Sequence, residues 1–100
     1  MPDQLRPTAG ARFVLELREA HAAGGAAYRA MIYVPDADWR GDAEMRDDGE
    51  AVVTGLDGAP PELRDKLAII AKLVARGASS RRDSGEKLWP ARVMRWRGPR

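Results

Sequence analysis

The hydrophobic pattern of this 100-residue chain changes its period once, near Leu56, and this change restricts the possible folds strongly. Before Leu56, apolar and polar residues alternate with the period of two that half-buried β-strands show. After Leu56, apolar residues recur at spacings of three and four, which is typical of an amphipathic helix. Strands followed by a helix predict an α+β domain, in which the helix covers one face of an antiparallel sheet.

Four segments with the period of two come before the change. We expect them to form strands at residues 11–20, 27–34, 39–46 and 50–56. Gly24-Gly25 is the turn signal between the first two, and Pro35 ends the second because proline cannot donate to a ladder. Asp47-Asp48-Gly49 predicts a tight hairpin turn between the last two, since Asp-Gly favours positive φ angles.

The segment 61–76 is predicted to be the helix. Its apolar stripe contains Leu63, Leu67, Ile70 and Val74, and Ile69 and Leu73 make the stripe wider. Pro61 is tolerated in a first turn, and Gly77 is a suitable stop. We expect residues 78–87 to be a polar, mobile connection to a fifth strand.

The C-terminal stretch LWPARVMRWRGPR predicts that strand, because Trp89, Ala91 and Val93 alternate with Arg92, Met94 and Trp96. The expected architecture is therefore ββββαβ, with about five antiparallel strands and one amphipathic helix packed on one face. We interpret residues 1–10 as a flexible N-terminal arm and residues 11–98 as a single domain. The predicted core consists of Phe13, Leu15, Leu17, Tyr28, Ile32, Val34, Val53, Leu63, Leu67, Ile70, Val74 and Val93.

The acidic stretch from Asp36 to Asp47 resembles a twelve-residue calcium loop only in its spacing of carboxylates and glycine. Such a loop needs an oxygen ligand at its fifth position, where this chain has the cationic Arg40. Its flanking segments are also strand-like rather than helical. We therefore interpret the stretch as a polar strand face with its turns, and we expect no metal site here.

Catalytic chemistry has few candidates in this composition. The chain has no cysteine and one histidine, His21, which excludes disulfides, thiol nucleophiles and sulfur-ligated zinc sites. His21 has no obvious partner in the local sequence, and its role is left open. The carboxylates Asp42 and Glu44 share a strand face, but Arg40 and Arg46 flank them there, which favours ion pairing over glycosidase-like catalysis. We expect a non-enzymatic protein without a cofactor, while an enzyme or small-ligand binder remains an open alternative.

The charge is divided along the chain, although the net charge is only +2. Residues 36–56 contain seven acids and two bases, whereas residues 81–100 contain seven bases and two acids. The basic end also contains tryptophans, and Trp and Arg are enriched at binding hot spots. The predicted binding residues are Trp89, Arg92, Arg95, Trp96 and Arg97.

Two functions fit this basic, aromatic strand. The first is a protein-interaction module, in which the strand pairs with a partner protein or with a second copy in a homodimer. The alternative is single-stranded nucleic-acid binding, in which bases stack on the rings and arginines meet phosphates. We expect a soluble, cytoplasmic protein without membrane association, because the first twelve residues lack the apolar core of a signal peptide.

Overall fold

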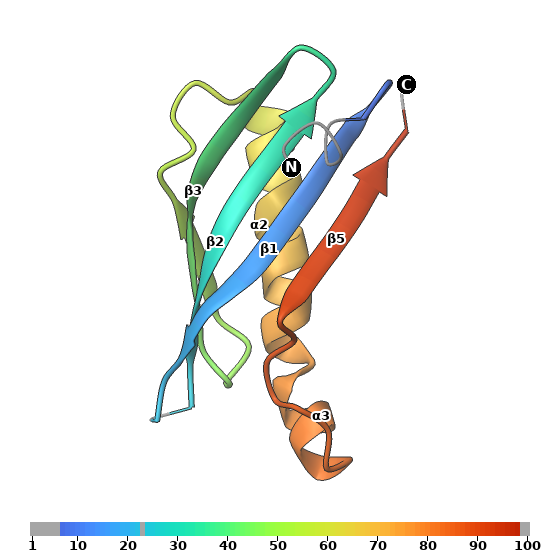
Figure 1. The fold of residues 1–100 in the computed structure, drawn as a ribbon. Coiled ribbons are helices and arrows are strands. Elements are labelled where there is room, and N and C mark those ends of the chain that lie inside the picture. Colours follow the sequence, from blue (N-terminus) through green and yellow to red (C-terminus); the bar gives the residue numbers. More distant parts are fainter. Residues whose placement is uncertain (1–6, 23, 99–100) are drawn as a thin grey trace.

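The computed structural model describes residues 7–22 and 24–98, which form a five-stranded antiparallel sheet with one long helix across one face (Figure 1). The elements are β1 (Ala11–Ala20), β2 (Ala26–Val34), β3 (Ala37–Met45), β4 (Ala51–Thr54), α2 (Pro61–Arg76), α3 (Ala78–Asp83) and β5 (Arg92–Arg97). The strand order in the sheet is β4-β3-β2-β1-β5. The predicted α+β fold is thus confirmed. Of the predicted arm, residues 1–6 lie outside the described residues, and residues 7–10 lead into β1.

The acidic stretch from residue 36 to residue 47 forms a turn, the strand β3 and the start of a hairpin. Val34 pairs with Ala37 across a two-residue turn, and β3 then runs antiparallel to β2. At the other end of β3, the Arg46 N–H donates to the Glu50 carbonyl at 2.8 Å. Gly49 closes this turn with a φ of 99°, a conformation that residues with a side chain rarely adopt. The predicted strand and its Asp-Gly turn are therefore confirmed.

The helix α2 has the predicted bounds, Pro61 and Arg76. Its chain enters from β4 at one edge of the sheet and leaves towards β5 at the opposite edge, so the helix crosses the sheet face (Figure 1). The helix packs mainly against β4 and β3 and less closely against β5. This asymmetric placement leaves space between α2 and β5, where the candidate site lies.

The core fills the space between α2 and the sheet. All twelve predicted core residues belong to it: nine are buried, and Leu17, Val34 and Val53 are partly buried against the rest. Small residues on both layers allow the helix and the sheet to approach each other; Ala30 of β2, Ala43 of β3 and Ala71 of α2 are among those with almost no exposed surface. The sequence pattern did not identify Met45, which is also fully enclosed.

The connection after α2 differs from the prediction of a polar, mobile segment. Gly77 has a right-handed φ of −77°, so the chain does not end its helical path there but continues into α3. Arg81 ties this segment to its surroundings, since its Nε donates to the Leu88 carbonyl at 2.6 Å and its Nη2 to the Val74 carbonyl at 2.7 Å. The fifth strand consequently begins at Arg92 rather than near Leu88.

The face of the sheet away from α2, called here the open face, holds a second small apolar cluster. Val14, Met31 and Tyr33 are buried there, and the Tyr33 hydroxyl donates to the Met31 sulfur at 3.3 Å. Among the described helices, none has the length and apolarity of a membrane-spanning segment.

Candidate protein-interaction edge

Among the strands that the structure describes, β5 is the last on its side of the sheet, so none of them pairs with its outer edge. On its inner edge, the Leu17 N–H donates to the Ala91 carbonyl at 2.9 Å, in register with the pair Leu15 and Val93. Hydrogen-bonded and non-hydrogen-bonded positions alternate along an antiparallel pair. The backbone groups of odd-numbered β5 residues therefore face β1, and those of Arg92, Met94 and Trp96 face the free edge.

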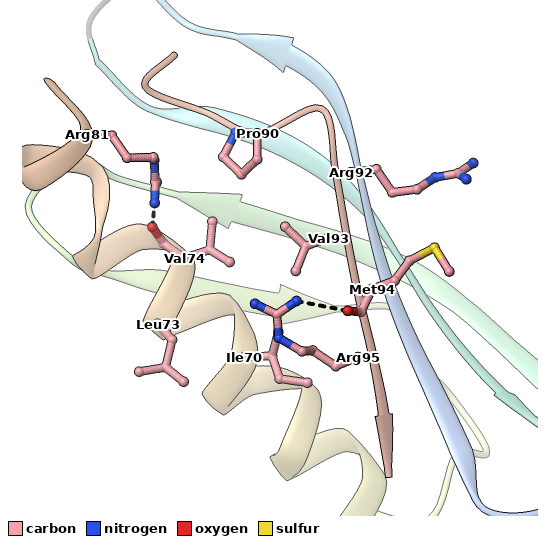
Figure 2. Close-up of a pocket in the computed structure, with 9 residues that line it drawn as sticks. All are labelled: Ile70, Leu73, Val74, Arg81, Pro90, Arg92, Val93, Met94 and Arg95. Atoms are coloured by element: carbon pink, nitrogen blue, oxygen red, sulfur yellow. Dashed lines mark hydrogen bonds between the residues drawn. The ribbon is translucent and has the colours of Figure 1, made fainter. Parts of the chain in front are cut away.

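The side chains of β5 alternate between the two faces of the sheet. Figure 2 shows Val93 and Arg95 pointing toward α2, whereas Arg92 and Met94 point away from it. By the same alternation Arg97 lies on the helix side, opposite Ala11, and Trp96 lies on the open face, opposite Arg12. Four of the five predicted binding residues are thus on β5, but they are divided between two faces.

The fifth predicted residue, Trp89, lies in the core between α2 and the sheet. Its exposed fraction is 4%, compared with 57% for Trp96. The Trp89 ring packs edge-on against Tyr28 at a centroid distance of 6.4 Å, and the Arg81 guanidinium lies 5.9 Å from the ring centre. Trp89 therefore holds the segment that leads into β5 and does not reach the surface.

Tyr28 fixes the same segment from the sheet. Its hydroxyl donates to the Pro90 carbonyl at 2.6 Å. Burial disfavours the charged phenolate and raises the pKa of Tyr28 to about 12, although the nearby Arg81 opposes this shift. The Nε1 of Trp89 is buried without a hydrogen-bond partner among the described residues, so the ring contributes here through packing.

A groove of about 340 Å³ separates β5 from α2 (Figure 2). Ile70 and Val74 of α2 and Val93 of β5 form its apolar part, and Arg95 lies across it. Leu73 lines the same groove with 61% of its surface exposed. A groove with this lining offers apolar contacts to a side chain that enters beside the free edge of β5.

Ile69 extends this apolar surface along α2. It lies on the flank of the helix that also carries Leu73 and Glu62, because these positions are separated by whole helical turns. Glu62 pairs with Arg97 of β5 at 3.7 Å, which identifies this flank as the one that faces β5. Ile69 is 54% exposed. The exposure of Ile69 and Leu73 could have been inferred from the sequence, because these two residues make the apolar stripe of α2 wider than one sheet face covers.

The three arginines of β5 interact with different groups. Arg92 forms an ion pair with Glu16 of β1 at 2.6 Å, and Arg97 pairs with Glu62 of α2. The Arg95 guanidinium donates to the carbonyl of its neighbour Met94 at 2.8 Å. Arg95 thus covers one of the outward-facing carbonyls of the free edge.

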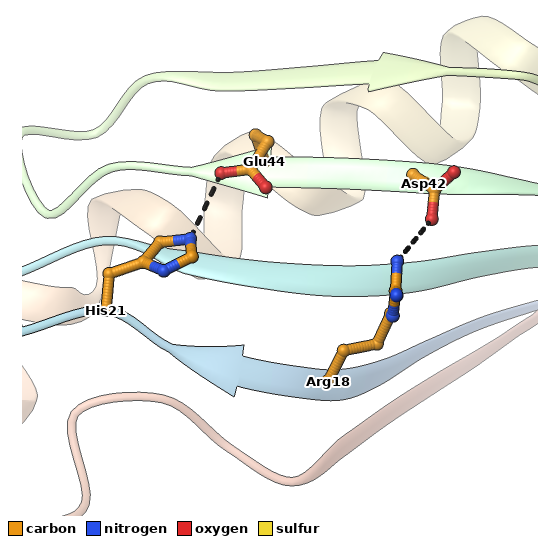
Figure 3. A network of polar contacts seen from close by, with 4 residues as sticks. All are labelled: Arg18, His21, Asp42 and Glu44. Carbon is orange, nitrogen blue, oxygen red and sulfur yellow. Dashed lines mark hydrogen bonds and ion pairs between the residues drawn. The ribbon is translucent and has the colours of Figure 1, made fainter.

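The carboxylates of β3 interact on the open face instead (Figure 3). Arg18 of β1 reaches across β2 to Asp42 at 3.1 Å, and His21 Nε2 lies 3.3 Å from Glu44. Ion pairing of Asp42, either across strands or with a neighbour, was expected, and its partner is Arg18 of β1. No partner for His21 could be identified from its local sequence, because the contact with Glu44 depends on the strand register.

The pocket beside His21 offers little for catalysis. It is lined by His21, Gly25 and residues 44–47, none of which carries a hydroxyl or thiol nucleophile. In the described part of the chain, no three histidine or acidic side chains come together in a way that would hold a metal ion. Comparison of the chain with models of protein families, with curated protein sequences and with solved structures finds no match.

Proposed function

We propose that this protein is a non-enzymatic interaction module that binds an extended segment of another protein chain by adding it to the free edge of β5. The observation that carries this proposal is the arrangement at that edge. The outward backbone groups of Arg92, Met94 and Trp96 lie directly beside the groove between β5 and α2. Strand addition uses backbone hydrogen bonds for affinity and side-chain pockets for specificity, and this edge offers both.

The two faces of β5 would each contribute to the binding of an added strand. Alternate side chains of that strand would enter the groove and contact Leu73 and Ile70, or lie on the open face beside Met94 and Trp96. Full burial of a leucine-sized side chain contributes about 1.5–3 kcal/mol, and each backbone hydrogen bond contributes about 0.5–1.5 kcal/mol net. Several such contacts are sufficient for a specific, reversible complex.

The opposite edge of the sheet is less suited to strand addition. β4 has four residues, whereas β5 has six. The helix α2 packs more closely against β4 than against β5. Short edge strands and covering elements are common ways by which proteins protect an edge from pairing. The contrast supports β5 as the edge used for binding.

Single-stranded nucleic-acid binding has one supporting observation, the exposed ring of Trp96 on a strand with three arginines. Three features weigh against it. Trp89 is buried, which leaves one stacking platform in place of the expected two. Arg92 is already paired with Glu16, and the carboxylates of Asp42 and Glu44 lie on the same face as Trp96. The protein-interaction function is therefore the better supported of the two.

The test uses a library of short random peptides displayed for selection against the full chain. Peptides selected by the wild type should also bind Met94→Ala but not Met94→Pro, because only proline removes the outward N–H. Trp96→Pro and Trp96→Ala form a second matched pair, in which the alanine variant should bind more weakly because the ring is lost and the proline variant should not bind. Thermal unfolding checks that each variant is folded. In the wild type, the amides of Arg92, Met94 and Trp96 should gain protection from hydrogen exchange when a selected peptide is bound.

The proposal is wrong if selected peptides bind the proline and alanine variants equally and leave these three amides unprotected. Binding of a labelled single-stranded oligonucleotide that weakens steeply with added salt, without any peptide selection, would favour the nucleic-acid alternative. Sedimentation velocity at low and high protein concentration measures self-association. A dimer that is lost in Met94→Pro and kept in Met94→Ala would support strand addition with a second copy as the partner.

A further inference from the structure

We infer that the added strand runs antiparallel to β5 and carries, in chain order, an acidic residue, any residue and an apolar residue, with the acidic residue opposite Arg95 and the apolar residue opposite Val93. This inference rests on the proposed function and specifies the chemistry of the partner. It follows from the charge of β5, from the contacts of Arg95 and from the lining of the groove.

The positive charge of β5 favours an acidic partner. The strand reads RVMRWR, with three arginines and no acid. Arg92 and Arg97 already have carboxylate partners in Glu16 and Glu62. Arg95 instead donates to the Met94 carbonyl, which faces the free edge. An added strand would present its own N–H to this carbonyl, and the guanidinium of Arg95 would then be released beside the incoming backbone.

The position opposite Arg95 is therefore suited to a carboxylate. Arg95 is exposed and points across the groove toward α2, and an added strand would cover it against Ile70 and the rest of the apolar lining and exclude part of the solvent (Figure 2). A charge pair formed in such partial shelter is stronger than one on an open surface, since fewer water molecules screen it. Cross-strand partners lie about 4.5–5.5 Å apart, which an aspartate or glutamate can bridge to a guanidinium.

The position opposite Val93 lies in the apolar part of the same groove. Val93, Val74 and Leu73 surround it, and Leu73 is largely exposed until something covers it. A leucine, isoleucine or valine at this position would cover Leu73, since Val74 and Val93 are already buried. Positions opposite residues 93 and 95 are two residues apart on the added strand, so both of their side chains enter the groove.

The direction of the added strand fixes the order of the two residues. Every strand pair in this sheet is antiparallel, and antiparallel pairing is slightly more stable per residue than parallel pairing. In an antiparallel strand, the residue opposite Arg95 comes before the residue opposite Val93. A parallel strand would reverse this order.

A second copy of β5 is a poorer partner by the same criteria. Antiparallel self-pairing centred on Met94 places Val93 of one copy opposite Arg95 of the other. No carboxylate of β5 then meets Arg95, and the two Arg95 side chains lie on the same face, two residues apart. Self-pairing therefore leaves Arg95 without an acidic partner, so we expect a partner with a different sequence.

The experiment compares three short peptides with blocked termini and identical threonine flanks. Their central residues are Glu-Thr-Leu, the reversed Leu-Thr-Glu, and Gln-Thr-Leu. Binding to the full chain is followed by shifts of the backbone amide signals in nuclear magnetic resonance, which also show whether the peptide lies along β5. We expect Glu-Thr-Leu to bind about tenfold more tightly than either of the other two.

Two variants assign this difference to Arg95. Arg95→Glu should bind Glu-Thr-Leu weakly and should bind a Lys-Thr-Leu peptide more tightly than the wild type does, because the charges are exchanged. Arg64→Glu is the matched control, since it makes the same change of charge on the part of α2 that lies beside β4, away from β5. This variant should keep the preference for Glu-Thr-Leu over Gln-Thr-Leu.

Each of the following results would contradict the inference, and each identifies the part that is wrong. Equal binding of the Gln and Glu peptides, with shifts along β5, would remove the acidic residue but leave strand addition in place. Tighter binding of Leu-Thr-Glu would show that the order, and so the direction, is wrong. A dimer that forms through β5 and excludes the peptides would identify the second copy as the occupant. If no peptide shifts the β5 signals and the displayed library also yields none, both the inference and the proposed function are wrong.

Discussion

The C-terminal segment has two halves that look alike in sequence and behave differently in the structure. The first half, residues 88–91, is held in the core by Trp89, while the second half, β5, forms the free edge with Trp96. One tryptophan is 4% exposed and the other 57%. An indole near an arginine can therefore stabilise the core or form a contact surface, depending on which face of the sheet it occupies.

Residues 88–91, the anchor, fix the position in which the chain enters β5, the edge strand. Tyr28 holds the Pro90 carbonyl, and Arg81 holds the Leu88 carbonyl, so the chain enters β5 in a defined position. An edge strand that is already held in one register loses little conformational entropy when a partner strand pairs with it. We therefore expect substitutions in the anchor to reduce stability and substitutions on the edge to reduce binding.

The largest expected effect is that of Trp89→Ala. Removal of this buried ring leaves a cavity beside Tyr28 and should lower the free energy of unfolding by about 3–5 kcal/mol. Chemical denaturation of the variant and the wild type measures the difference. A loss below about 1 kcal/mol would show that Trp89 is not an anchor, and the contrast between the two halves would fail.

The second prediction concerns how the free energy of unfolding depends on pH through Tyr28. Because the folded pKa of Tyr28, about 12, lies above the unfolded value of 10.0, the folded state retains the phenol proton longer than the unfolded state. This stabilisation is fully present below pH 10 and is lost as the pH rises from 10 to about 12. The loss amounts to roughly 2–3 kcal/mol.

Denaturation at a series of alkaline pH values measures this loss, and Tyr28→Phe is the control. The variant lacks the phenol, so the Tyr28 part of the pH dependence should vanish while contributions from lysines remain. An identical alkaline loss in both proteins would contradict the buried, neutral phenol.

Arg81→Met should have a smaller effect, about 1–3 kcal/mol of lost stability. The substitution removes the donors to the carbonyls of Leu88 and Val74 and leaves these groups to find water. Arg82→Met is the matched control in the same helix, because Arg82 forms an exposed ion pair with Asp47. Exposed pairs contribute about 0–1 kcal/mol. Equal losses in the two variants, measured by thermal denaturation, would mean that Arg81 does not fix the segment.

The smallest expected effect on stability is that of Trp96→Ala. Its ring is mostly exposed, and its Nε1 donates to the Ala9 carbonyl at 3.0 Å, so the free energy of unfolding should change by about 0.5 kcal/mol or less. Affinity for a peptide selected on the wild type should nevertheless fall, since the open-face side chains of the added strand lose this contact. A large loss of stability would place Trp96 with the anchor rather than with the edge.

Several elements were predictable because their signals are local. The helix α2 has the predicted bounds, since an apolar stripe with a period of 3.6 residues, an initial proline and a final glycine all describe the same segment. The alternation along the C-terminal stretch also groups Trp89 with Val93, a predicted core residue. The inward position of Trp89 could therefore have been inferred, together with the helix-side positions of Arg95 and Arg97.

Other features depended on contacts between distant residues. The pairing of His21 with Glu44 and of Arg18 with Asp42 follows from the register of β1, β2 and β3. The helical turn of α3 follows from Arg81, whose partners are seven residues away on both sides. No local pattern contains these relationships, because each requires two elements to be placed first.

Periodicity, proline and glycine positions were enough to establish four strands, one helix and a closing strand, because secondary structure depends on which residues are neighbours along the chain. The groove beside β5 has a different origin. The helix lies closer to β4 and β3, and this offset leaves Leu73 and Arg95 beside an unpaired edge. Such an offset arises from how the side chains of separate elements pack together, which no single segment of the sequence specifies.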